Sequence, residues 1–297
     1  SIEWHGTCWL YYQVETLVFG QAVERALKPE RFIVGCAAPE AGLEPRLAAY
    51  LGAFGCPILP MRYESAELSK IAINFCLVAS IGVANTLAEA SEVVGADWSE
   101  VVPALKLDRR IGQWAYLHPG LGIAGGNLER DLRTILELSK TSDIDVGIVN
   151  AWIANSEHRR GWALERARGL LARLGPRPRI AVWGLAYKEN TNSTKNSPSL
   201  FTISGLPEAD IVAHDPVVPA STIPNVTGAA DPVAAAKGAD LLMILTPWPE
   251  YRGVAAQALA AAMRGRVVID PYGVLKDAGL TRAGLEHHVM GRPPALP

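Results

Sequence analysis

Cysteine is scarce in this chain, and its scarcity limits the kinds of site that the chain can build. Four of the 297 residues are cysteines, Cys8, Cys36, Cys56 and Cys76, and none has the short spacing of a metal-binding pair. A small secreted domain held together by disulfides carries a denser set. We therefore expect free thiols in a reducing compartment, a cytoplasmic location and no metal site.

An excess of charge of one sign is also missing. The 28 Lys and Arg residues nearly balance the 30 Asp and Glu residues, and the net charge is −2. A chain that binds nucleic acid or an anionic membrane through its bulk charge carries a positive excess. The balance argues against both kinds of partner, although it is compatible with a local basic patch.

Neither a secretion signal nor a membrane anchor is expected. Residues 1–5 contain no basic segment ahead of an apolar run. The most apolar long stretch, residues 71–87, carries Asn74 and Asn85, and its apolar residues recur with helical spacing, which argues against a membrane span. We interpret it as a buried helix of a globular protein.

The chain has enough length and apolar content for two domains with cores of their own, since 49% of it is hydrophobic and 20% is charged. Short apolar runs bounded by Gly or Pro predict buried strands at residues 31–35, 56–60, 179–186, 209–216, 239–246 and 266–270. Helical periodicity predicts helices at residues 40–54, 64–96 and 132–174. The fold class is therefore α/β, and the alternation after residue 178 predicts a Rossmann-like parallel sheet with ligand groups at its carboxyl edge.

Glycines are concentrated in residues 119–132, which read Pro-Gly-Leu-Gly-Ile-Ala-Gly-Gly-Asn-Leu-Glu-Arg-Asp-Leu. Glycine lets a backbone adopt positive φ and approach a ligand closely. A glycine loop that leads into a helix can hold an anionic or sugar ligand, and we predict that Asp131 lies where a helix over residues 132–138 begins.

The glycines at 120, 122 and 125 also have the spacing of a dinucleotide-binding loop. That loop must follow a buried strand, whereas residues 109–118 are polar and aromatic without a β-branched run. We therefore reject the dinucleotide interpretation. A plain surface turn remains as the other alternative.

The glycine stretch resembles the active-site loop of the UDP-glucose/GDP-mannose dehydrogenases, which usually reads Pro-Gly-x-Gly-Tyr-Gly-Gly-Ser-Cys-Phe-Pro-Lys-Asp. Five residues match in place: Pro119, Gly120, Gly122, Gly125 and Asp131. The catalytic cysteine of the family falls on Asn127, and the neighbouring departures include Glu129 in place of the proline. The resemblance extends over nearly the whole chain.

Two further motifs concern the catalytic centre. Residues 64–74, Glu-Ser-Ala-Glu-Leu-Ser-Lys-Ile-Ala-Ile-Asn, resemble the family's Glu-Ser-Ala-Glu-Leu-x-Lys-x-x-x-Asn. By spacing alone, Lys70 and Asn74 would be a solvated pair on one helix face. The resemblance implies instead that they line the catalytic centre. Glu15 falls on the acid of the family's Asn-Pro-Glu-Phe-Leu motif, although its neighbours differ.

Other motifs concern the substrate. Residues 108–112, Asp-Arg-Arg-Ile-Gly, are similar to the family's Asp-x-Arg-Ile-Gly, whose arginine, here Arg110, binds the substrate. Residues 184–191 resemble Gly-Leu-Ala-Phe-Lys-x-Asn-Thr, whereas the family's Asp-x-Arg-Glu-Ser becomes Ser-Thr-Lys-Asn-Ser at 193–197. Its distal arginine becomes Tyr272. The substrate-binding residues implied by the resemblance are Arg110, Tyr116, Gly122, Gly125, Lys188 and Lys195, and the cofactor-binding candidates are Lys195 and Tyr272.

The resemblance also implies an organisation and a set of partners. Residues 1–60 would be the end of an NAD-binding Rossmann domain, 61–174 a central helical dimerisation and active-site region, and 175–297 a Rossmann-like domain for the UDP- or GDP-sugar. NAD is the implied cofactor, with its main site upstream of Ser1, and a homodimer through the 64–96 helix is the implied assembly. The implied pathway is polysaccharide biosynthesis.

Asn127 decides which chemistry the resemblance permits. The family oxidises a sugar alcohol to a carboxylate with two NAD through a covalent intermediate on the cysteine, and an asparagine amide is not a comparable nucleophile. In the family's roles, Lys70 would stabilise oxyanions, Asn74 and Asp131 would hold a water, and Glu15 would assist hydrolysis. We expect a two-electron dehydrogenase of a nucleotide sugar. The alternatives are an inactive nucleotide-sugar binder or partner subunit, and an ordinary enzyme altered at the cysteine.

Overall fold

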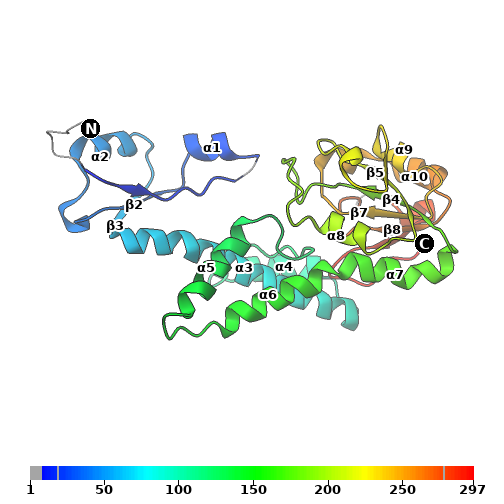
Figure 1. Ribbon diagram of the computed structural model, residues 1–297, viewed down its shortest axis with the longest axis horizontal. Helices are drawn as coiled ribbons and strands as arrows, with labels where there is room; N and C mark the ends of the chain where they lie inside the picture. Colours follow the sequence, from blue (N-terminus) through cyan, green and yellow to red (C-terminus); the bar gives the residue numbers. More distant parts are fainter. Residues whose placement is uncertain (1–8, 19, 277) are drawn as a thin grey trace. The chain divides into compact units, whose positions relative to one another are not determined.

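The computed structural model describes residues 9–18, 20–276 and 278–297 (Figure 1). The predictions that concerned residues 1–5 and Cys8 lie outside these residues. The chain divides into two compact units, Ser1–Cys76 and Leu77–Pro297, and each is described by itself. The three-part organisation expected from the sequence stays a prediction.

The first unit is built on a three-stranded sheet in the order β1-β2-β3. Strand β2 (Phe32–Gly35) pairs antiparallel with β1 (Tyr12–Gln13) and parallel with β3 (Ile58–Met61). The two predicted strands are thus confirmed. Three helical segments join them: α1 (Ala22–Leu27), η1 (Pro39–Ala41) and α2 (Pro45–Gly52).

Successive side chains of strand β2 point to opposite sides of the sheet, and all four of its residues are buried, so both sides of the strand are covered. Phe32 and Val34 pack with Leu51 of α2, whereas Ile33 packs on the other side with Val14. Helix α2 is shorter than the predicted helix over 40–54. It begins at a proline, and the carboxylate of the preceding glutamate caps its first two N–H groups.

Helix α3 (Tyr63–Val94) runs without a break and ends before Gly95, which has φ +81°. The prediction that it is buried is wrong, because its apolar side is largely uncovered: Leu68 is 57% exposed and Val83 is 51% exposed. Among the described residues it is the one helix long and apolar enough to cross a membrane, by length and composition only, and 28% of that window is buried.

Four helices follow α3 in the second unit. They are α4 (Trp98–Leu107), α5 (Asn127–Ser139), α6 (Gly147–Arg160) and α7 (Trp162–Leu174). Helix α6 lies along α3, where Asn155 Nδ2 donates to Thr86 Oγ1 over 3.0 Å and His158 Nε2 lies 2.8 Å from Glu89 Oε1. The predicted helical character of residues 132–174 is confirmed, and it is divided among α5, α6 and α7, with irregular residues between α5 and α6.

A six-stranded parallel sheet forms the core of the second unit, in the order β6-β5-β4-β7-β8-β9. Its strands are β4 (Arg179–Trp183), β5 (Asp210–His214), β6 (Val226–Gly228), β7 (Leu241–Ile244), β8 (Val267–Ile269) and β9 (Glu286–His288). Figure 1 shows α9 (Pro232–Ala236) and α10 (Ala256–Ala262) on one side, and α7 with α8 (Pro198–Ser204) on the other. Short 3-10 turns complete the unit: η2 (Ala220–Thr222), η3 (Pro249–Gly253) and η4 (Thr281–Ala283).

The sheet confirms the predicted α/β class and Rossmann-like alternation. All residues of β7 are buried, as is all of β4 except its first residue, because helices cover both faces of a parallel sheet. The order of the strands reverses between β4 and β7. At such a switch point the loops after the two strands diverge, and ligands bind there in open α/β sheets.

Candidate functional site

The loops after β4 and β7 meet at the switch point through a glycine. Gly184 has φ +90°, and a Cβ added to it would lie 2.3 Å from Thr246 Cβ. Only glycine therefore permits this backbone conformation and this close packing. Thr246 Oγ1 in turn donates to Ala186 O over 2.6 Å, so the threonine holds the first residues of the loop that follows β4.

Asp215, which follows β5, organises the same loop. Its carboxylate accepts the backbone N–H groups of Leu185 (2.6 Å), Ala186 (3.0 Å), Val217 (2.9 Å) and Val218 (2.8 Å). Burial by itself would raise the pKa of Asp215, but the four N–H donors outweigh it and the pKa lies below its ordinary value. The ionised carboxylate thus joins the loops after β4 and β5.

The glycine loop 119–126 is not a plain surface turn. Leu121 is 1% exposed, and Gly120 N donates to Asn85 Oδ1 over 2.9 Å. Gly122 has φ +74°, and a Cβ there would lie 2.3 Å from the backbone oxygen of Ser156 on α6. Residues 109–118 form no strand, which supports the rejection of a dinucleotide-binding loop.

Helix α5 begins at Asn127, immediately after the glycine loop. The prediction that Asp131 opens a helix is therefore wrong, because the helix starts one turn earlier with Gly126 as its N-cap. Asn127 is exposed, whereas Asp131 is 5% exposed and Arg130 Nε donates to its Oδ1 over 3.1 Å. Asn127 and Asp131 are four residues apart, so they share one face of α5.

The loop after β4 packs directly on the glycine loop. A Cβ added to Gly125 would lie 2.8 Å from the Tyr187 ring, and one added to Gly126 would lie 3.0 Å from Lys195 Nζ. Asn196 Nδ2 donates to Gly125 O over 2.9 Å. The structure therefore brings together Gly125 and Lys195, two of the predicted substrate-binding residues, at the first turn of α5. Sequence reasoning missed Tyr187 and Asn196.

Tyr272 and Lys188 lie in the same unit. Burial raises the pKa of Tyr272, whose hydroxyl hydrogen-bonds to the backbone of Leu121. Burial lowers the pKa of Lys188, and Glu189 opposes this effect. Burial followed by the charge of Glu189 raises the pKa of Tyr116. The charge of Glu189, a residue to which the sequence assigned no role, thus influences the pKa of all three side chains.

Arg110 differs from the other predicted residues, because its side chain is 89% exposed and paired with a neighbour. Its Nε donates to Asp108 Oδ1 over 3.0 Å. The hydrogen bond raises the pKa of Arg110 and lowers that of Asp108. The roles of Arg110, Tyr116, Lys188, Lys195 and Tyr272 as ligands of a sugar or of NAD stay predictions.

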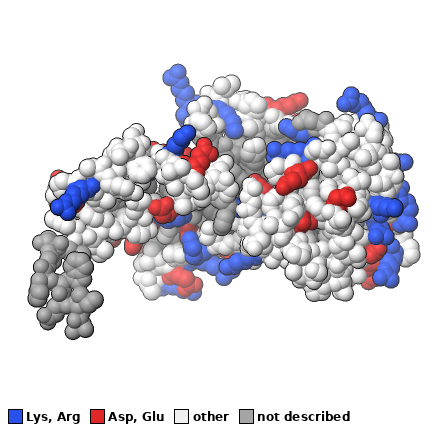
Figure 2. Space-filling view, turned by 90° about the horizontal axis from the view of Figure 1, so that it is seen from above, with Lys and Arg blue, Asp and Glu red and all other residues white. Residues whose placement is uncertain are grey.

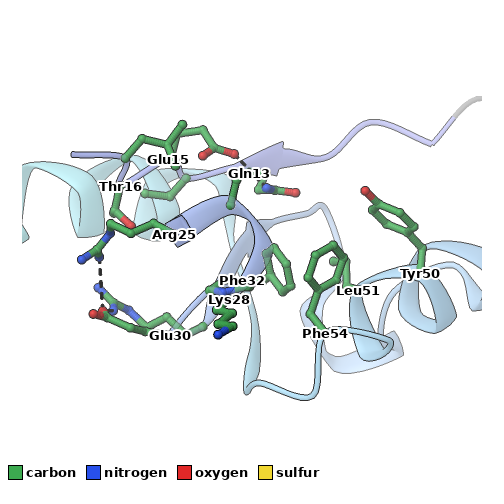
Figure 3. Close-up of a pocket in the computed structure, with 15 residues that line it drawn as sticks. Gln13, Glu15, Thr16, Arg25, Lys28, Glu30, Phe32, Tyr50, Leu51 and Phe54 are labelled. Atoms are coloured by element: carbon green, nitrogen blue, oxygen red, sulfur yellow. Dashed lines mark hydrogen bonds and ion pairs between the residues drawn. The ribbon is translucent and has the colours of Figure 1, made fainter. Parts of the chain in front are cut away.

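The first unit contains the remaining predicted residues. Asn74 is 8% exposed and lies one turn beyond the half-buried Lys70 on α3. Glu15 lines a cavity of about 260 Å³ and accepts a hydrogen bond from Gln13 Nε2 over 2.9 Å (Figure 3). Figure 3 shows Arg25 and Glu30 on one side of this cavity and apolar side chains on the other. The catalytic roles of Glu15, Lys70 and Asn74 stay predictions.

Among the described residues, no glycine-rich turn leads from a buried strand directly into a helix, which is the arrangement that holds the diphosphate of NAD in dinucleotide-binding folds. In the described ranges, no group of three or more His, Cys, Asp or Glu could hold a metal ion. Figure 2 shows Lys and Arg side chains interspersed with Asp and Glu on the face that it presents.

Two family models match the chain. Residues 64–157 match the central domain of the UDP-glucose/GDP-mannose dehydrogenase family, and residues 181–277 match its UDP binding domain. The chain belongs to this family. Its members are NAD-dependent nucleotide-sugar dehydrogenases that serve polysaccharide biosynthesis. The second match contains the loop after β4, and the first contains the glycine loop and the beginning of α5.

Individual proteins similar to this chain are UDP-glucose dehydrogenases, in agreement with the family assignment. The chain is 30% identical over 285 residues to the UDP-glucose 6-dehydrogenase TuaD of Bacillus subtilis. The aligned region covers 94% of this chain and 61% of that protein. It is 29% identical to a UDP-glucose 6-dehydrogenase of Pseudomonas aeruginosa, with 95% and 64% covered. The structure of a UDP-glucose dehydrogenase from Pyrobaculum islandicum matches with a TM-score of 0.77 at 27% identity, over 94% of this chain and 62% of that one. The chain thus spans less than two thirds of these proteins.

Proposed function

We propose that this chain binds a UDP- or GDP-linked sugar at the carboxyl edge of its six-stranded sheet and takes part in NAD-dependent oxidation of a CH–OH group of that sugar. The observation that carries the proposal is the contact between the glycine loop and the loop after β4, through Tyr187, Lys195 and Asn196. The N–H groups at the start of α5 and the Lys195 ammonium suit an anionic diphosphate.

The oxidation that we propose removes two electrons and stops at the carbonyl. Asn127 occupies the family's cysteine position, and its amide cannot form the thioester of the four-electron reaction. Residues 77–297 contain no cysteine, so the second unit has no other thiol to offer. The chemistry that bound NAD would supply is that of a hydride acceptor.

The chain's own side chains have the following proposed roles. Asp131 serves as the base that takes up the proton of the substrate hydroxyl. Asn74 and Lys70 keep the roles that the family resemblance gives them: Asn74 binds a water, and Lys70 stabilises the negative oxygen that develops. Asn127 hydrogen-bonds to the reacting end of the sugar. With Asn127 in place of the cysteine, Glu15 has no thioester to help hydrolyse, so its role becomes electrostatic. The free thiols support a cytoplasmic location as part of the same proposal.

The second candidate function is a nucleotide-sugar binder or partner subunit without activity of its own. It is favoured by Lys195 and Tyr272, which stand where the family has arginines.

Titration of the purified protein with UDP- and GDP-sugars in the presence of NAD separates these functions. The absorbance of reduced NAD is followed, and sugar binding is measured by calorimetry. One reduced NAD per sugar is the expected result. Two per sugar would show that the reaction needs no cysteine, and binding without reduction would establish the second candidate. Absence of binding would overturn both.

A further inference from the structure

Asn196 makes two hydrogen bonds that cross from the loop after β4 to the beginning of α5. Its Nδ2 donates to Glu129 Oε2 over 2.6 Å and to Gly125 O over 2.9 Å. The backbone of Asn196 has φ +53°, a left-handed conformation that asparagine and aspartate adopt more readily than other residues with a Cβ. The side chain is therefore held where both acceptors are within reach.

The two side chains of this contact, Asn196 and Glu129, are complementary as hydrogen-bond donor and acceptor. Both are departures from the family motifs, since Glu129 stands where the family has proline and Asn196 stands where it has glutamate. A glutamate at position 196 would bring a second carboxylate toward Glu129, and two carboxylates at hydrogen-bonding distance repel each other. The amide of Asn196 donates instead, so the pair attracts.

We infer that Asn196 and Glu129 form a bridge that positions Lys195 for binding of the nucleotide diphosphate. The inference rests on the proposed function. Lys195 is the residue next to Asn196, and its ammonium lies against Gly126, the N-cap of α5. The bridge fixes the loop at that point, so Asn196 and Glu129 are positioning residues, and Lys195 is the residue that they position.

The bridge is tested by reversing its polarity. Asn196→Asp keeps the left-handed backbone but places two carboxylates together, and Glu129→Gln then supplies an amide that donates to the new carboxylate. The matched control is Asn225→Asp, because Asn225 is exposed like Asn196, has φ +60° and lies directly before β6. UDP is the probe, with affinity measured by calorimetry and amide hydrogen exchange measured over residues 189–197.

We expect Asn196→Asp to weaken UDP binding and to speed exchange of the loop by about tenfold each, and the double variant to recover most of both. Equal behaviour of Asn196→Asp and Asn225→Asp, or no recovery in the double variant, would overturn the bridge. If the unaltered protein does not bind UDP, the proposed function and the role of the bridge in it both fail. Exchange without UDP still decides whether the contact itself exists.

Discussion

At the scale of single residues, Asp215 shows how a carboxylate can hold backbone rather than act on a ligand. It accepts N–H groups from both loops that it joins, and these bonds depress its pKa. A carboxylate with a depressed pKa stabilises the folded protein above its ordinary pKa of about 3.9. This stabilisation is lost as the pH falls through the lower pKa of the folded state.

We therefore expect Asp215→Asn to lower the free energy of unfolding by about 2 kcal/mol at pH 7, because an amide cannot accept all four N–H groups. The difference from the unaltered protein should shrink as the pH falls from about 4 through the lower pKa of the folded state, since the carboxylate of the unfolded chain binds its proton first. Urea unfolding at pH 7 and at pH 3 measures both values. Asp143→Asn, an exposed position, is the control, and a difference that does not depend on pH would contradict this account.

Gly184 combines two constraints that can be separated. Gly184→Ala meets both a positive φ and a clash with Thr246, whereas Gly175→Ala meets only the positive φ of +85° with open space around it. We expect a loss of about 1 kcal/mol at Gly175 and a further 1–3 kcal/mol or so at Gly184. Equal losses in urea unfolding would show that the clash is relieved by a shift of the loop.

At the scale of whole elements, the uncovered side of α3 suits a helix partner. Val83, Leu87 and Val94 are exposed at spacings of four and seven residues, and such spacing forms one apolar stripe. We propose that a second copy of the chain covers this stripe in a homodimer. The prediction of a buried helix was wrong for the isolated chain because periodicity identifies an apolar face but not what covers it.

Val83→Glu together with Leu87→Glu should convert such a dimer to a monomer, because an unpaired carboxylate in an apolar interface costs several kcal/mol. Light scattering measures the molar mass. Ile148→Glu on α6 is the control, since Ile148 is 57% exposed outside the stripe. A monomeric unaltered protein would refute the homodimer.

Elements with strong local patterns could be predicted from the sequence, whereas those fixed by distant pairing could not. The buried runs at β4 and β7 are continuous and apolar, so they were found. Strands β6 and β9 have three residues each, and pairing with β5 and β8 defines them. In the site, glycine spacing identified the loop at 119–126. The contact of Asn196 with Glu129 joins residues 67 positions apart and left no local signal.

At the scale of the whole molecule, the two units should respond differently to ligand and denaturant. The largest apolar cluster lies in the second unit, and smaller clusters stabilise the first. We expect unfolding in two steps, with the first unit opening at lower urea. UDP at 100 times its dissociation constant should stabilise only the second step, by about 2.7 kcal/mol. Hydrogen exchange of segments from each unit checks this, and a single cooperative transition would contradict it.

The position of the cysteines gives the chain a chemical reporter of its own. Of the three described thiols, Cys36 is buried, Cys56 is partly buried and Cys76 is exposed. Cys76 precedes Val83 by seven residues on α3, so it continues the apolar stripe. A thiol reagent should alkylate Cys76 quickly in dilute protein and slowly in concentrated protein. The labelling rate, read by peptide mass spectrometry, would then follow association of the chain without any substitution.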